Sequence, residues 1–145
     1  MSIASLLAVL KIFDGSEPSL EEQAQLAKEV MLMTLARAAA SDTNIADIEV
    51  EKVREVLLAR TGEDFSSSDV RVAANSNIYE KAPLEKYIAT SAKKLASKER
   101  VGIAHALAEV INADGRVGSG EIDFFNGCVK ALGITAADLM GLEKV

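Results

Sequence analysis

The chain has 145 residues and a formal net charge of −6, with 49% hydrophobic residues, 4% aromatic residues and no Trp. This length can bury the core of one domain without disulfides or metal ions, and the acidic balance excludes generic electrostatic binding to nucleic acid. The low aromatic share and the recurrence of Ala and Leu favour packed helices. The sequence therefore predicts one all-α domain spanning residues 1–145.

The stretch from Met1 to Phe13 is apolar apart from its serines and Lys11, and it predicts a first helix. We do not expect it to be a signal peptide, because a basic leading region is missing and Lys11 interrupts the apolar run. It is also too short to span a bilayer. We expect this helix to pack on its own domain in a cytoplasmic protein. A peripheral membrane helix is the alternative, although its polar face lacks Lys/Arg enrichment.

The next two helices have local start signals. Ser19 and Glu22 have the capping-box spacing, and Asp47 is a candidate N-cap. The residues expected to face the core are Leu20, Ala24, Ala27, Met31, Leu35 and Ala38 in the first of these helices, and Val50, Val53 and Leu57 in the second. Both patterns have the helical period.

Three further helices are expected between residues 66 and 111. Ser66 opens the least regular one, Pro83 suits the first position of another, and Ser97 is a candidate N-cap. Their expected core residues are Val70, Val72, Ala73 and Ile78, then Leu84, Tyr87, Ile88, Ala92 and Leu95, then Val101, Ala104, Leu107, Ala108 and Ile111.

The C-terminal part predicts two more helices. Ser119 is the candidate N-cap of one, Gly133 is expected to end it, and Thr135 is expected to cap a short last helix. The inward residues of the longer helix are Ile122, Phe125, Val129 and Leu132. Cys128 lies within this apolar pattern, which predicts a buried, inert thiol and a reducing compartment.

Two acidic turns share the pattern Asp-x-x-(Ile/Val)-x-x-x-Glu, and their residue numbers differ by a constant offset (114 − 42 = 121 − 49 = 72). Their acids are Asp42, Glu49, Asp114 and Glu121. Apolar residues flanking the turns match at the same offset. The pattern predicts a duplicated helix-turn-helix unit, with repeats at about 20–65 and 84–141.

The second turn resembles the latter half of a calcium EF-hand loop, but the first half differs. Loop position 1 would be Ala38 in the first copy and Val110 in the second, which excludes an ordinary EF-hand for the first copy and disfavours one for the second. In the simplest structural reading, each Glu accepts backbone N–H groups at a helix start, while each Asp closes the turn. Gly115 would supply a left-handed conformation there, whereas Thr43 takes its place in the first copy.

If the two units pack together, the four acids could meet on one face. Their carboxylates are hard oxygen ligands suited to Ca²⁺, Mg²⁺ or Mn²⁺, so the hypothesis is a metal site formed by Asp42, Glu49, Asp114 and Glu121. The alternative is a protein-interaction scaffold whose acids only cap helices and whose negative surface binds a basic protein partner. The sequence leaves the oligomeric state open.

Residues suited to catalysis are few. His105 is the one histidine, and the sequence has no Glu-x-x-His pair, Gly-rich phosphate loop, zinc-type cluster or nucleophile beside a base. We therefore expect a protein that is not an enzyme. A carboxylate metalloenzyme is a third reading, disfavoured by the single histidine.

The chain resembles the TerB-like, tellurite-resistance family, and is similar to the N-terminal region of membrane-associated DnaJ-like co-chaperones. The resemblance rests on the stretches 36–49 and 107–121 and on Ala131-Leu-Gly-Ile-Thr135, and it covers about residues 20–141. It implies a compact bundle of about seven helices with an internal pseudo-twofold axis and a role in stress response. It also implies a metal-associated site at the four acids, with Thr43 departing from the family's Gly.

Overall fold

The computed structural model describes residues 19–39, 47–74, 84–113, 115 and 117–141, and these form seven helices. The helices are α2 (Leu20–Ala39), α3 (Asp47–Thr61), α4 (Ser67–Ala74), α6 (Leu84–Ala92), α7 (Ser97–Ile111), α8 (Ser119–Leu132) and α9 (Ala136–Leu139). The predicted all-α bundle is confirmed. The helix expected from Met1 to Phe13, together with Ile78 and Pro83, lies outside the described residues. None of the described helices has the length and apolar character needed to cross a membrane.

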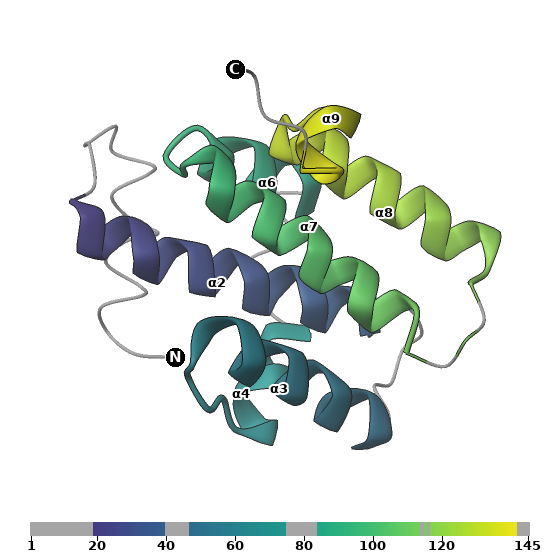
Figure 1. The fold of residues 1–145 in the computed structure, drawn as a ribbon. Helices are drawn as coiled ribbons and strands as arrows, with labels where there is room; N and C mark the ends of the chain where they lie inside the picture. Colours follow the sequence, from purple (N-terminus) through teal and green to yellow (C-terminus); the bar gives the residue numbers. More distant parts are fainter. Residues whose placement is uncertain (1–18, 40–46, 75–83, 114, 116, 142–145) are drawn as a thin grey trace.

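Helix α2 is the centre of the bundle. It contacts α3, α4, α6, α7 and α8, and Figure 1 shows α3 and α4 on one side of it, with α6, α8 and α9 on the other. Its middle, from Glu29 to Ala36, is buried on all sides, as expected for a helix surrounded by others. The expected one-sided stripe is therefore wrong at its N-terminal end, where Leu20 and Ala24 are exposed. In Figure 1 this end of α2 reaches beyond the other described helices.

Three helices begin with reciprocal capping boxes, in which a hydroxyl and a carboxylate three residues later each accept the other residue's backbone N–H. The pairs are Ser19 with Glu22, Ser66 with Asp69 and Thr135 with Asp138, at 2.9 to 3.1 Å. The predicted helix starts at these three places are confirmed. Gly133, with φ 69°, ends α8 in the left-handed conformation, also as expected.

The predicted caps at Ser97 and Ser119 are wrong by one residue. Both serines are the first residues of their helices, and the N-caps are Ala96 and Gly118 in extended conformation. Asp47, the third predicted cap, is likewise a helical residue of α3. Helices α7 and α8 start one residue earlier than the hydroxyl signals suggested.

The core faces agree with expectation in α3 and differ in part in α8. Val50, Val53 and Leu57 of α3 are buried, whereas α8 buries Cys128 and Leu132 and leaves Ile122 exposed. Cys128 follows Ile122 by six positions, which places the two side chains about 120° apart around the helix axis. The predicted inward position of Ile122 is therefore wrong, as is that of Val72 in α4, which is exposed.

The duplication expected from the two acidic turns stays a prediction, because residues 40–46, which include the first turn, lie outside the described residues.

Candidate functional site

A groove of about 590 Å³ lies where the ends of α2 and α7 meet the starts of α3 and α8. Its described lining residues are Ala38, Ala39, Ile48, Glu49, Glu51, Lys52, Glu55, Val110, Ile111, Ala113 and Glu121. Alanine, valine and isoleucine side chains make part of its wall, and four carboxylates and one ammonium group make the rest. We call this the acidic groove.

The structure brings Glu49 and Glu121 to the acidic groove from different helices. Glu49 lies on α3 and Glu121 on α8, and their residue numbers differ by the offset of the acidic turns (121 − 49 = 72), so the two carboxylates occupy matching places in the two predicted repeats. Of the four predicted metal ligands, these two are described. Asp42 and Asp114 lie outside the described residues, and their place in the site stays a prediction.

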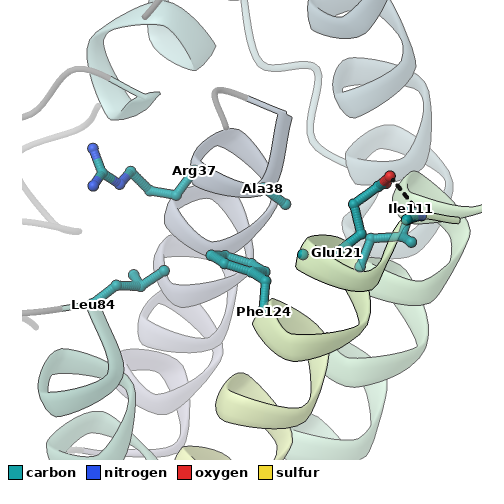
Figure 2. Close-up of a pocket in the computed structure, with 8 residues that line it drawn as sticks. Arg37, Ala38, Leu84, Ile111, Glu121 and Phe124 are labelled. Carbon is teal, nitrogen blue, oxygen red and sulfur yellow. Dashed lines mark hydrogen bonds between the residues drawn. The ribbon is translucent and has the colours of Figure 1, made fainter. Parts of the chain in front are cut away.

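Glu121 has a structural role as well as a place in the groove. Its Oε1 accepts a hydrogen bond from the backbone N–H of Gly118 at 3.2 Å, and Figure 2 shows the side chain turning back toward this bond. A carboxylate in the first helical turn also interacts favourably with the helix dipole. The prediction that Glu121 caps a helix is therefore confirmed. One of its two carboxylate oxygens accepts the capping hydrogen bond.

Gly115 has φ +74°, as predicted for the turn before α8. Its backbone N–H donates to the carbonyl oxygen of Asn112 at 3.1 Å, and this hydrogen bond forms a turn directly after α7. A residue with a Cβ is disfavoured at this φ, so the glycine suits a tight turn here. Thr43, the matching residue of the first unit, lies outside the described residues.

Glu51 and Glu55 also line the groove, a position not predicted from the sequence. Ile48, Glu51 and Glu55 follow one another at three- and four-residue spacing, which places them on one face of α3. That spacing was the signal available in the sequence. Both carboxylates have cationic neighbours: Arg54 Nη1 lies 3.0 Å from Glu51 Oε1, and Lys52 Nζ lies 3.8 Å from Glu55 Oε1.

A second hollow, of about 500 Å³, borders the first along Ile111 and Glu121. In Figure 2, Phe124 points toward α2, with Arg37 and Leu84 on one side of it and Glu121 on the other. This hollow is mostly apolar on the Leu84 and Phe124 side. Arg37 Nη1 donates to the carbonyl oxygen of Ala74 at 3.1 Å, which links α2 to the end of α4.

The side chains with catalytic potential lie elsewhere and are engaged. His105 Nε2 lies 2.8 Å from the carbonyl oxygen of Leu139, and Glu109 is ion-paired with Arg60 of α3. Cys128 is buried as predicted, and burial, together with the nearby Glu85 charge, raises the pKa of its thiol to about 12. Such a thiol is a poor nucleophile at neutral pH.

Within the part of the chain that the structure describes, no three His, Cys, Asp or Glu side chains are grouped to hold a metal ion. Asp47, two residues before Glu49, is ion-paired with Arg71 of α4. The described part of the acidic groove thus supplies Glu49 and Glu121 as a pair of hard oxygen donors at matching positions.

The comparisons with known proteins identify the family. The model described as "Tellurite resistance protein TerB" matches residues 28–144. No curated protein and no solved structure matches the chain. Since the matched region includes both acidic turns and every described helix from the middle of α2 onward, the chain belongs to the TerB family.

Proposed function

We propose that this TerB-family protein is a non-enzymatic, cytoplasmic stress-response module that binds a divalent cation in the acidic groove. One observation carries the proposal: Glu49 and Glu121, at matching positions of the two acidic turns, line the same groove. The family description associates the module with tellurite resistance. The cation would link the two helix-turn-helix units at the point where their turns meet.

The donor chemistry suits Ca²⁺, Mg²⁺ or Mn²⁺, which prefer carboxylate and carbonyl oxygens. Glu49 and Glu121 would supply one carboxylate each, and Asp42 and Asp114 are the further ligands expected from the sequence. A groove of about 590 Å³ is large enough for an ion that keeps several of its water ligands. Mg²⁺ in particular is usually held by one or two carboxylates with water completing its shell.

A non-enzymatic role is supported by the way the potential catalytic groups are used. His105 is hydrogen-bonded to the Leu139 carbonyl, and the pKa of Cys128 is raised to about 12 by burial. Neither residue lines the acidic groove. Among the described residues, a base or nucleophile facing that groove would therefore have to come from its carboxylates or from Lys52.

Isothermal titration of the protein with CaCl₂, MgCl₂ and MnCl₂ tests the proposal. We expect saturable binding of at least one ion, weakened about tenfold or more in Glu49→Gln/Glu121→Gln and in Asp42→Asn/Asp114→Asn. Glutamine at 121 keeps an oxygen that can accept the Gly118 hydrogen bond, so the first variant removes charge and leaves the cap in place.

The matched control is Glu51→Gln/Glu55→Gln, which removes the same charge from the same groove at positions outside the acidic turns. We expect at most a few-fold weakening from this control, through lost long-range attraction. Equal weakening by both double variants would mean diffuse attraction and no defined site. Absence of binding heat with all three ions would refute the cation function.

A further inference from the structure

Three hollows meet at Ile111 and Glu121. The acidic groove and the hollow of Figure 2 are joined there by a third, of about 160 Å³, whose lining includes Val117, Ile122 and Phe125. The start of α8 is therefore surrounded by a depression larger than any single hollow. Grooves of this kind, lined by apolar side chains with a few polar groups, are typical of binding sites.

Large apolar side chains around this depression are exposed. Ile48 is 81% exposed, Ile122 48% and Val117 42%. Ile122 matches Val50 at the offset of the acidic turns, and Val50 is only 1% exposed. The second unit thus leaves in solvent a position whose counterpart in the first unit is buried. Exposed apolar side chains that line connected hollows indicate an interaction surface.

The charge around the depression is negative. The described residues lining the three hollows include four glutamates together with Lys52 and Arg37, within a chain of net charge −6, so negative side chains outnumber positive ones by two (4 − 2 = 2). Surface of this composition favours a partner that brings cationic groups to the rim and apolar groups to the hollows.

We propose that this surface binds an amphipathic helical segment of a protein partner, with apolar side chains in the hollows and Lys or Arg facing the glutamates. The proposal shares its location with the cation function but is carried by the exposed Ile48, Val117 and Ile122. An amphipathic helix places apolar residues at i, i+3, i+4 and i+7 on one face, which is how helices bind in apolar grooves. The cationic side chains then lie beside that face.

Fluorescence anisotropy with labelled designed peptides tests this inference. The probe is a Leu/Lys peptide of helical period, compared with a Leu/Glu peptide of the same pattern and a Ser/Lys peptide of the same charge. We expect saturable binding of the Leu/Lys peptide alone, weakened about tenfold in Ile48→Ser/Ile122→Ser and reduced at high salt. Equal binding of the Ser/Lys peptide would reduce the effect to bulk charge and overturn the proposal.

The control variant is Leu20→Ser/Met140→Ser, which removes two exposed apolar side chains that line none of the three hollows. It should bind the peptide like the wild type, and equal loss in both double variants would overturn the inference. Circular dichroism should show the same helical content in both variants, because the changed residues are exposed. If sedimentation showed a dimer that Ile48→Ser/Ile122→Ser dissociates, a second copy of this chain would be the occupant, and the partner proposal would fall.

The two proposals fail separately. Peptide binding should persist in excess chelator. The Ile48→Ser/Ile122→Ser variant should still release or absorb the heat of cation binding in the isothermal titration. Loss of peptide binding with the cation heat intact would overturn only this inference. Peptide binding in a chain that shows no cation heat would support this inference and refute the cation function.

Discussion

Glu121 Oε1 and the backbone N–H of Gly118 are joined by a 3.2 Å hydrogen bond, so a carboxylate of the acidic groove also fixes the first turn of α8. The two roles can be separated by substitution. Glu121→Gln should cost only a few tenths of a kcal/mol in unfolding free energy, since the acceptor remains and only the helix-dipole interaction is lost. Glu121→Ala should cost about 1 kcal/mol. Urea denaturation measures both, and equal losses would show that the oxygen acceptor contributes nothing.

Hydroxyl residues at the other helix starts should differ in how much they contribute to the unfolding free energy. Ser66→Ala and Thr135→Ala should each cost about 1 kcal/mol in unfolding free energy, because each hydroxyl accepts a backbone N–H bond at a helix start. Ser97→Ala is the matched control and should change stability by less than about 0.5 kcal/mol, since Ser97 lies inside α7. A cost at Ser97 equal to that at Thr135 would contradict the observed start of α7.

Glu29 is a buried carboxylic acid in the middle of α2. Its burial predicts that the unfolding free energy falls as the pH rises. Burial raises its pKa to about 7, with smaller contributions from the Glu63 and Asp69 charges, against an ordinary value of 4.5. The folded state therefore holds this proton more tightly than the unfolded state does. The folded protein should be destabilised progressively as the pH rises from about 4.5 to about 7, and the full cost should remain above that range.

Glu29→Gln removes this titration. At pH 8 the variant should exceed the wild type in unfolding free energy by up to about 3 kcal/mol, the value of this pKa difference at 1.36 kcal/mol per unit. A buried amide without a partner would reduce the gain. Below pH 4.5 the gain should vanish. Urea midpoints of both proteins at the two pH values measure the difference, and a gain independent of pH would exclude the titration of Glu29 as its source.

Cys128 should be protected from thiol reagents in the folded protein. With its pKa at about 12, the thiolate fraction at pH 8 is on the order of 10⁻⁴, and the sulfur is also buried. Labelling with a disulfide reagent should be slow in buffer and fast in concentrated urea. Rapid labelling of the folded chain would contradict the buried position of this side chain.

Local signals in the sequence predicted the starts of α2, α4 and α9 and placed the caps of α7 and α8 one residue late, and the structure shows which part of each signal matters. In five described helices a carboxylate lies at the third helical residue and accepts the N–H of the residue before the helix; the pairs are Glu22 with Ser19, Asp69 with Ser66, Glu99 with Ala96, Glu121 with Gly118 and Asp138 with Thr135. Ser97 and Ser119 have no acid three residues later. Giving the hydroxyl more weight than the acid shifted both predicted caps by one residue.

The arrangement of the site could not be predicted without knowing the tertiary fold. The pattern around Asp114 and its upstream copy identified Glu49 and Glu121, because matching turns repeat in the sequence. Which other side chains face the groove depends on how α3 packs, so Glu51 and Glu55 were not predicted. Burial could not be predicted fully for a similar reason. The helical period alone does not show which side of α8 packs against a neighbour, so the exposure of Ile122 was not predicted.

Paramagnetic broadening by Mn²⁺ in ¹H–¹⁵N NMR spectra tests the central claim most directly. Substoichiometric Mn²⁺ should broaden amide signals at the starts of α3 and α8, around Glu49 and Glu121, and leave those of α9 sharp. In Glu49→Gln/Glu121→Gln this selective broadening should disappear, while Glu51→Gln/Glu55→Gln should retain it. Broadening centred elsewhere, or spread evenly over the acidic residues of the chain, would contradict a cation site in the acidic groove.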